Sequence, residues 1–234
     1  MTLHEKVSQM LSWAPAIERL GIPAYNWWSE GIHGIGRAGT ATVFPQAIGM
    51  AAAFDEDMME QVGNAVGVEA RGKYNMCRAH GDRDIFKGLT VWAPNINIFR
   101  DPRWGRGHET YGEDPFLTSR LGVRFVEGMQ GDDPDYLQAA ACAKHFAVHS
   151  GPESDRHHFN AIVSKQDLWE TYLPAFRALV KEAGVEAVMG AYNRTNGEPC
   201  CGSKTLLKDI LRDKWHFDGH VTSDCWAIKD FHTG

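Results

Sequence analysis

The run AAACAKHF, residues 139–146, is apolar except for a lysine and a histidine near its end, Lys144 and His145. Its length and composition predict a buried strand. Residues 164–184 follow with apolar side chains at helical spacing, a serine at capping-box spacing at the start and a glycine at the end. VEAVMGAY, residues 185–192, is again a short apolar run. The order strand, helix, strand predicts two parallel strands joined by a helix.

The same alternation extends outward from this unit. LTVWAPNI at 89–96 predicts a strand, residues 117–129 predict a helix, and HVTS at 220–223 predicts a last strand, with a helix capped by Ser203 before it. Alternating strands and helices favour a mainly parallel sheet with helices outside it, either a closed barrel or an open doubly wound sheet. GIHGIGRAG at 31–39 lacks the preceding buried strand of a dinucleotide-binding loop. We therefore predict an α/β fold, a (β/α)8 TIM-type barrel.

The composition is that of an ordinary globular chain. The 234 residues carry a formal net charge of -6, and 43% of them are hydrophobic, which fits one domain with a sizeable core. Lysine and arginine do not cluster, so neither nucleic acid nor an anionic membrane surface is expected as a partner. No run of about 18 apolar residues suggests a membrane span. The five cysteines form no CxxC pair or zinc-type spacing, so no metal site is expected.

Polar side chains follow the predicted strands at their carboxyl ends, which meet in one pocket in a barrel. They are Asn95, Asn97, Lys144, His145, Tyr192, Asn193 and Asp224. A carboxylate such as Asp224, near the indole of Trp226, can act as a nucleophile toward an anomeric carbon, although an aspartate after a strand is also a common helix cap. Lys144 lies within an apolar run, so its ammonium needs a carboxylate or a polar ligand. A core ion pair would satisfy it equally well.

A charged segment, FRDPRWGRGHETYGEDP at 99–115, alternates arginines with carboxylates around one tryptophan. On composition alone we expect a loop in which these charges pair with one another. Some of them are expected to be structural even if one contacts a ligand.

Six segments resemble successive signature blocks of the glycoside hydrolase family 3 N-terminal barrel domain, in the order of that family. They are NWWSEGIHG (26–34), TVFPQAIGMAAAFD (42–55), PNINIFRDPRWGRGHETYGEDP (94–115), AKHFAVHSGPE (143–153), GAYNRTNGEPCCGS (190–203) and HVTSDCWAI (220–228). They are most similar to the β-xylosidase and β-glucosidase members. The blocks cover the chain almost end to end.

The resemblance implies a retaining glycosidase that releases a terminal sugar from a β-linked oligosaccharide or an aryl glycoside. It implies Asp224 as the nucleophile. It also implies a set of side chains that bind the terminal sugar: Glu30, Arg106, Lys144, His145, Arg156, Tyr192 and Trp226. Arginine, lysine and histidine can hydrogen-bond sugar hydroxyls, and nearby cations are expected to lower the pKa of Asp224. No metal and no organic cofactor is implied.

Two departures from the family pattern favour the xylosidase branch. Glu30 stands where most β-glucosidases of the family have aspartate, and Cys225 follows the nucleophile where tryptophan is common. Glutamate is one methylene longer than aspartate, so its carboxylate would crowd the hydroxymethyl group that a hexose carries and a pentose lacks. One methylene discriminates by only about 1 to 3 kcal/mol, so side activity on glucosides or arabinosides is expected.

A third departure concerns length. Members of this branch carry a second, α/β sandwich domain that packs on the barrel and supplies the glutamate acid/base. We expect residues 1–234 to be one barrel domain that ends before its last strand, without the sandwich domain, and therefore to have little activity alone. The opening MTLHEKVSQM is unlike a signal peptide. The chain as written would be cytoplasmic, whereas the full-length protein could be periplasmic or secreted.

Two alternatives stay open. A β-N-acetylglucosaminidase of the same family would use an Asp-x-His dyad, here Asp155 and His157, although its Pro-Gly-His-Gly stretch is replaced by residues 147–150. That replacement favours Arg156 as a sugar ligand, with His157 as its neighbour. The other alternative is a non-catalytic sugar-binding module.

Overall fold

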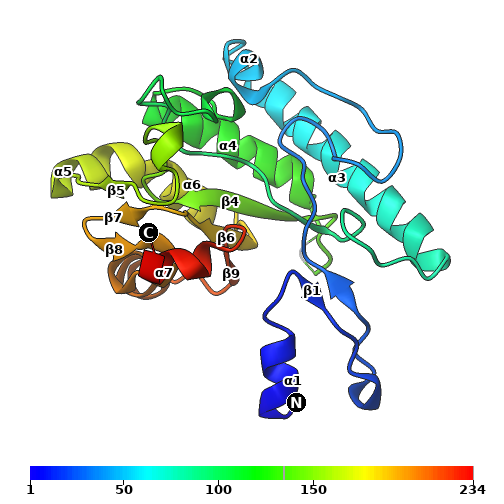
Figure 1. Ribbon diagram of the computed structural model, residues 1–234. Coiled ribbons are helices and arrows are strands. Elements are labelled where there is room, and N and C mark those ends of the chain that lie inside the picture. Colours follow the sequence, from blue (N-terminus) through cyan, green and yellow to red (C-terminus); the bar gives the residue numbers. More distant parts are fainter. Residues whose placement is uncertain (134, 234) are drawn as a thin grey trace.

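The computed structural model describes residues 1–133 and 135–233, and its centre is a four-stranded parallel sheet (Figure 1). The strands lie in the order β3 (Thr90–Val91), β4 (Ala140–Phe146), β6 (Ala187–Gly190) and β9 (His220–Ser223). Lys144 is paired with Met189, which is paired in turn with Thr222, so the carboxyl ends of the three longer strands lie side by side. The sheet is curled and forms part of a TIM-type barrel, which confirms the predicted fold class.

The main helices pack on one side of this sheet. They are α3 (Glu56–Ala79), α4 (Pro115–Gln130), α6 (Pro174–Lys181) and the π-helix η6 (Lys204–Lys214). As predicted, Ser203 caps the last of these, because its side chain accepts a hydrogen bond from the amide of Leu206. The predicted cap at Ser164 is also confirmed: it accepts from the amide of Asp167 at 3.0 Å.

Two predicted elements differ from the structure. The helix expected over 164–184 is broken into α5 (Lys165–Asp167), a π-helix η4 (Leu168–Tyr172) and α6. Pro174 begins α6, and since proline has no amide hydrogen to donate, it interrupts the ladder of hydrogen bonds at that point. The strand expected over 89–96 is shorter in the structure, and a proline again lies at the interruption. β3 ends at Val91, Pro94 follows three residues later, and pairing with β4 resumes only as a single bridge between Asn95 and Lys144.

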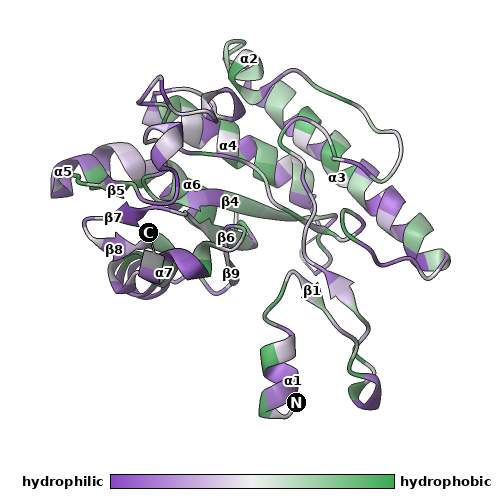
Figure 2. Cartoon of the chain, viewed as in Figure 1, coloured by the Kyte–Doolittle hydropathy of each residue, from purple (hydrophilic) through white to green (hydrophobic). Residues whose placement is uncertain are grey.

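The two faces of the sheet differ in what covers them. On the outer face, alternate strand residues such as Ala141, Ala143 and Val188 pack against the helices in a large cluster, here called the outer core. Its largest fully buried side chains include Phe125, Phe146, Phe176, Leu179 and Trp215. Figure 2 shows hydrophobic residues along β4, α3 and α4, where this core lies.

The inner face carries a much smaller apolar set, here called the inner cluster. It consists of Trp92, Cys142, Ala187 and Met189, with Trp27, Trp28 and Cys225 packed against it. Cys142 and Lys144 are two residues apart in β4, and strand side chains alternate between faces, so both belong to the inner face. On the inner face of β4, the thiol of Cys142 is therefore followed by the charged side chain of Lys144.

The remaining elements are short. The N-terminal segment holds α1 (Leu3–Ser8), η1 (Glu18–Leu20) and the antiparallel pair β1 (Trp13–Ala14) and β2 (Tyr25–Asn26). A small second sheet consists of β5 (Asn160–Ala161), β7 (Arg194–Thr195) and β8 (Glu198–Pro199). Short helices complete the chain: α2 (Ala47–Ala51), η2 (Gly107–Glu109), η3 (Glu153–Asp155), η5 (Cys200–Gly202), η7 (Ala227–Lys229) and α7 (Asp230–Thr233). Among the described residues, none of the helices has the length and apolar character needed to cross a bilayer.

Candidate active site

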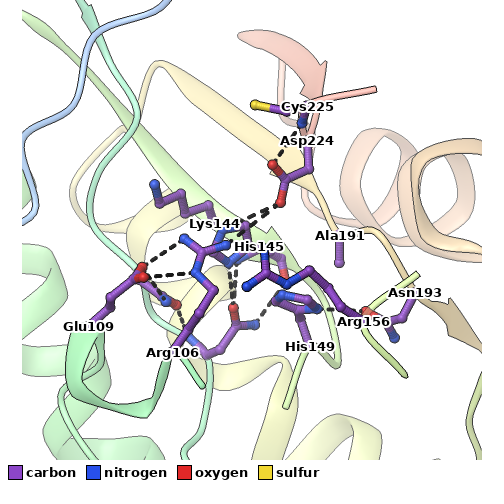
Figure 3. A network of polar contacts seen from close by, with 12 residues as sticks. Arg106, Glu109, Lys144, His145, His149, Arg156, Ala191, Asn193, Asp224 and Cys225 are labelled. Carbon is purple, nitrogen blue, oxygen red and sulfur yellow. Dashed lines mark hydrogen bonds and ion pairs between the residues drawn. The ribbon is translucent and has the colours of Figure 1, made fainter. Parts of the chain in front are cut away.

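The polar side chains predicted to converge do meet, at the carboxyl ends of β4, β6 and β9 (Figure 3). Lys144 and His145 lie in β4, Tyr192 follows β6, and Asp224 comes directly after β9. Arg106 reaches the same place from the start of η2. Because parallel strands end at the same edge of a sheet, Lys144 and Asp224 are brought together although they are 80 positions apart in sequence (144 to 224).

Asp224 is the centre of this arrangement and is only 5% exposed. Its amide donates to Gly190 O at 3.1 Å, and its Oδ1 accepts from the amide of Cys225 at 2.8 Å. Its Oδ2 is buried without a hydrogen-bond partner, 3.6 Å from His145 Nε2 and 4.0 Å from Arg106 Nη1. One carboxylate oxygen is therefore anchored by the main chain, while the other faces a cation and an imidazole that lie beyond hydrogen-bond distance.

The pKa of Asp224 differs from the sequence-based expectation. Burial raises it above the ordinary value, and the opposing effects of Arg106, the Cys225 amide, Lys144 and the Tyr192 side chain do not reverse this. The expectation that nearby cations lower the pKa of Asp224 was therefore wrong in its net direction. The cations are present, but the loss of water around the carboxylate outweighs them.

Arg106 is held by a carboxylate that the sequence did not single out as part of the site. Its Nε and Nη2 donate to the two oxygens of Glu109 at 2.8 and 2.7 Å, and Asn95 Nδ2 lies 3.4 Å from Glu109 Oε2. Burial raises the pKa of Glu109, but the paired bonds to Arg106 more than compensate, so its pKa is lowered overall. The spacing of three residues between Arg106 and Glu109 was a usable signal for this pair.

Lys144 is 3% exposed and has the carboxylate partner that its buried position requires. Its Nζ lies 3.4 Å from Glu30 Oε2, and Trp28 Nε1 donates to Glu30 Oε1 at 3.0 Å. Glu30 is thus brought to the site by its contact with Lys144, and its side chain remains 38% exposed. Trp28 was not identified from the sequence as a site residue.

Two histidines are buried beside Asp224. Burial, followed by the positive charges of Arg106 and other neighbours, lowers the pKa of His145 well below its usual range. His149, four residues later, has its pKa lowered to about 3, again chiefly by burial and then by Arg106. Their ring centroids are 4.9 Å apart. Both rings are therefore neutral near pH 7, and His149 is a member of the site that sequence reasoning missed.

Tyr192 links Asp224 to the loop after β4. Burial, then the charge of Asp224, raises the pKa of Tyr192, and the guanidinium carbon of Arg156 lies 5.9 Å from the centre of its ring. Arg156 itself forms an ion pair with Glu153. The ring of His157 lies against Tyr192 with a centroid distance of 4.6 Å.

The structure gives His157 a different partner from the one that a β-N-acetylglucosaminidase dyad requires. His157 Nδ1 lies 2.8 Å from Oδ2 of Asp230, a buried residue at the start of α7. Asp155 ends the short helix η3, and its carbonyl accepts from the amides of His158 and Phe159. The geometry therefore gives no support to a pair formed by Asp155 and His157.

Trp226 differs from the other predicted site residues because it is 71% exposed. Its ring centroid is 6.2 Å from that of Trp28, which places it at the rim of the site. Its φ of 59° is unusual for a bulky residue.

The charged side chains of residues 99–115 form local ion pairs, as predicted. Arg103 pairs with Asp101, and Arg106 pairs with Glu109.

Within residues 1–133 and 135–233, no group of three or more histidine, cysteine, aspartate or glutamate side chains could hold a metal ion. The cysteines are free thiols, of which Cys142 and Cys200 are buried.

Comparison with known sequences points to one family. A family model described as "Glycosyl hydrolase family 3 N terminal domain" matches residues 2–233. A xylan 1,4-β-xylosidase of Xylanibacter ruminicola is 52% identical over 99% of this chain, and a probable β-D-xylosidase of Arabidopsis thaliana is 46% identical over 98% of it. The chain spans only 27% and 32% of the lengths of these two relatives.

Solved structures agree. An exo-β-xylosidase, solved with a xylobiose aziridine activity-based probe, superposes with a TM-score of 0.87 and 36% identity over 98% of this chain and 31% of its own. A β-glucosidase of Bifidobacterium adolescentis superposes with a TM-score of 0.83 and 34% identity over 97% of this chain and 32% of its own.

Proposed function

This chain belongs to glycosyl hydrolase family 3, and on that premise we propose that it forms the nucleophile-bearing part of a retaining exo-acting β-glycosidase. The enzyme releases a terminal β-linked xylose or glucose, with xylosides preferred. The names of the xylosidase and glucosidase relatives support this substrate class. The observation that carries the proposal is the buried Oδ2 of Asp224, which has no hydrogen bond and lies among cationic and hydroxyl-bearing side chains.

In the proposed first step, Asp224 Oδ2 attacks the anomeric carbon. A bond forms between Oδ2 and that carbon, and the bond to the leaving-group oxygen breaks with its electron pair going to that oxygen. Water then attacks the same carbon and gives a proton to the acid/base residue, while the bond between Oδ2 and that carbon breaks, which releases the sugar and restores the carboxylate. The hydrogen bond from the Cys225 amide to Oδ1 fixes the carboxylate orientation, so that Oδ2 is the attacking atom.

The side chains around Asp224 would bind the terminal sugar. Lys144 and Arg106 supply donors, and Tyr192 supplies a hydroxyl that can both donate and accept. His145, Arg156 and Trp226 complete the proposed sugar-binding set. In a site shielded from water, each bond to a sugar hydroxyl that forms more strongly in the transition state contributes to rate.

Glu30 would provide the preference for a pentose. Its carboxylate accepts from Lys144 and Trp28, which fixes its position beside the site. The extra methylene of glutamate, compared with aspartate, brings this carboxylate toward the space that a hexose hydroxymethyl group needs. The expected discrimination is about 1 to 3 kcal/mol.

The proton for the leaving group would come from outside these 234 residues. Glu109 is held in the ionised form by Arg106, and Glu30 already accepts hydrogen bonds from two donors. Both carboxylates are therefore engaged as hydrogen-bond acceptors, and we assign the proton donor elsewhere. We propose that the whole protein carries an α/β sandwich domain that packs on this barrel domain and supplies a glutamate acid/base, as the family resemblance implies.

The nucleophile is tested by covalent trapping with dinitrophenyl 2-deoxy-2-fluoro-β-xyloside, whose leaving group needs no protonation. Mass spectrometry of the intact chain and of its peptides should show one fluoroxylosyl group on Asp224. The Asp224→Asn chain should take up no label, and Asp218→Asn, a change at an exposed aspartate, should label as the wild type does. A label on another carboxylate would remove Asp224 from its role.

The origin of the proton is tested with two substrates. The chain should release nitrophenol slowly from nitrophenyl xyloside and should leave xylobiose intact, because only the latter needs an acid. Rapid xylobiose hydrolysis would show that the donor lies within these residues. Calorimetric binding of xylose by a chain that is never labelled would instead indicate a non-catalytic sugar-binding module.

A further inference from the structure

Two asparagine side chains lie against the two buried histidines in the same way. Asn97, which follows β3, bonds His145, and Asn193, which follows β6, bonds His149. In each pair the asparagine oxygen contacts the Nδ1 atom of the imidazole, at 2.9 Å and 3.1 Å respectively. All four residues are at most 3% exposed.

The orientation of the Asn97 amide is fixed by its main-chain partners. Its Nδ2 donates to the carbonyls of His145 at 2.8 Å and Ala147 at 3.0 Å, and its Oδ1 accepts from the amide of His145 at 2.8 Å. Carbonyls only accept and a main-chain amide only donates. A flipped amide would place oxygen against two oxygens and nitrogen against a donor, so one orientation alone satisfies the network.

This orientation decides which nitrogen of His145 carries the proton. Asn97 Oδ1 is an acceptor, so the His145 Nδ1 atom at 2.9 Å must be the donor. In a neutral imidazole the other nitrogen, Nε2, then has a bare lone pair. That lone pair faces Asp224 Oδ2 at 3.6 Å, which leaves two acceptors opposite each other without a proton between them.

Burial, and then the positively charged groups around it, keep His145 neutral. Arg106 approaches from η2, Lys144 from β4, and Arg156 from the loop after β4, and each disfavours a further positive charge. The carboxylate of Asp224, from the end of β9, opposes them, but its Oδ2 lies 3.6 Å from Nε2, beyond the hydrogen-bond limit. The site therefore holds three cations on long side chains and keeps the imidazole uncharged.

We infer that Asn97 is a positioning residue that holds His145 in the Nδ1–H tautomer, so that the Nε2 lone pair accepts a hydrogen bond from a hydroxyl of the bound sugar. The assignment of the tautomer follows from the hydrogen bonds alone, whereas its use as an acceptor for sugar rests on the proposed function. Lys144 and Arg106 can only donate to a sugar, so His145 would add an acceptor beside them. A neutral His145 also leaves Asp224 Oδ2 free of a hydrogen bond that would weaken it as a nucleophile.

The tautomer is tested by long-range proton–nitrogen NMR of the 234-residue chain labelled with 15N-histidine. The resonances of His145 are assigned by their loss in His145→Gln. We expect a protonated Nδ1 and a bare Nε2 that stay unchanged between about pH 5 and pH 8, the range in which an ordinary histidine titrates. A protonated Nε2, or titration within that range, would overturn the inference.

The role of Asn97 is tested by Asn97→Asp, with Asn193→Asp as the matched control. The carboxylate should favour the imidazolium form, so the Nε2 resonance of His145 should move to its protonated position in the first variant and stay in place in the second. The second variant should move only the resonances of His149. An unmoved His145 resonance in folded Asn97→Asp would remove Asn97 from the role, and if that variant does not fold, the wild-type spectrum decides the tautomer.

The acceptor role is tested by titrating xylose into the wild-type chain. We expect the His145 Nε2 resonance to shift at saturation while Nδ1 stays in place. If other site resonances saturate and Nε2 does not shift, sugar binding stands and the acceptor role is wrong. If xylose does not bind at all, the proposed function fails and the acceptor role fails with it, while the tautomer is still decided by the spectrum of the free chain.

Discussion

The two faces of β4 differ sharply although they are made by alternate residues of one strand. Ala141 and Ala143 point to the outer core, where apolar side chains of the helices meet the sheet, whereas Cys142 and Lys144 point to the inner face. The outer face buries large aromatic side chains against helices. The inner face ends in buried ionisable groups, whose desolvation costs free energy. The outer face therefore stabilises the fold, whereas the inner face destabilises it in part because it buries a reactive carboxylate.

The largest contrast is expected for Asp224→Asn on the inner face. Covalent labelling should fall by about 10,000-fold or more, because the nucleophile is removed. At pH 7 the variant should also be more stable than the wild type, since burial raises the pKa of Asp224 in the folded chain and an amide avoids burying a charge. Each kcal/mol gained should raise Tm by about 2 to 4 °C.

The pH dependence of the stability difference provides a control for the sign of this effect. A raised folded pKa means that the wild type loses stability as pH rises through that pKa, and that the loss is absent below the unfolded value of about 3.9. The advantage of Asp224→Asn should therefore disappear in acid. A variant that is less stable than the wild type at pH 7 would contradict the account of an uncompensated buried carboxylate.

Phe176→Ala tests the outer face. Phe176 is fully buried and its ring centroid lies 4.9 Å from that of Phe146, so the truncation should cost about 3 to 5 kcal/mol in the free energy of unfolding. Urea unfolding measures this loss. The labelling rate per folded molecule should be unchanged, and a selective loss of labelling in the folded fraction would show that the two faces are not separate in their roles.

Glu30→Asp tests the specificity of the inner face. Shortening the side chain should relax the preference for a pentose by about 1 to 3 kcal/mol, or roughly 10- to 200-fold. The ratio of labelling rates with fluoroxylosyl and fluoroglucosyl reagents measures it. Glu113→Asp, at an exposed position, is the control and should leave the ratio in place. An unchanged ratio in Glu30→Asp would remove Glu30 from the discrimination.

His149→Gln tests the cost of burying a neutral histidine. The pKa of His149 is lowered to about 3, so between that value and the unfolded value of about 6.5 only the unfolded chain binds the proton. Stability should therefore fall with decreasing pH by about 1.4 kcal/mol per pH unit for this residue. Glutamine does not titrate, so the slope measured by urea unfolding should decrease by that amount. An identical slope would mean that His149 is protonated in the folded chain.

The smallest effect on stability is expected for Trp226→Ala. This side chain is 71% exposed, so the free energy of unfolding should change by no more than about 0.5 kcal/mol. Xylose affinity, measured by calorimetry, should weaken if the indole borders the sugar. A stability loss comparable to that of Phe176→Ala would contradict the exposed position.

Local signals in the sequence were sufficient for much of this architecture. Capping at Ser164 and Ser203, the strand at 220–223 and the convergence of Lys144, His145 and Asp224 all follow from spacing and from the parallel order of the strands. These features depend on residues close together in sequence or on one topological rule, so reading the chain segment by segment could find them.

Other features depend on geometry between distant segments. Asn97 is oriented by the carbonyls of His145 and Ala147, some 50 positions away, and no pattern in either segment shows that fit. The pKa of Asp224 was predicted in the wrong direction because charge can be read from the sequence, whereas the water removed by packing cannot. Pro94 and Pro174 indicate breaks in a strand and in a helix, but the apolar periodicity around each of them predicts one longer, continuous element.

The position of β9 has a practical consequence. It is the last strand in the order β3, β4, β6, β9, and within the described residues no strand pairs with its other side. Its main-chain donors and acceptors on that side form a template on which another extended chain can align, and unprotected edges of this kind promote aggregation. A preparation of these 234 residues should therefore need low concentration or a mild solubilising additive to stay dispersed. Because Asp224 directly follows β9, molecules that associate through this edge would also lose access to their reactive carboxylate.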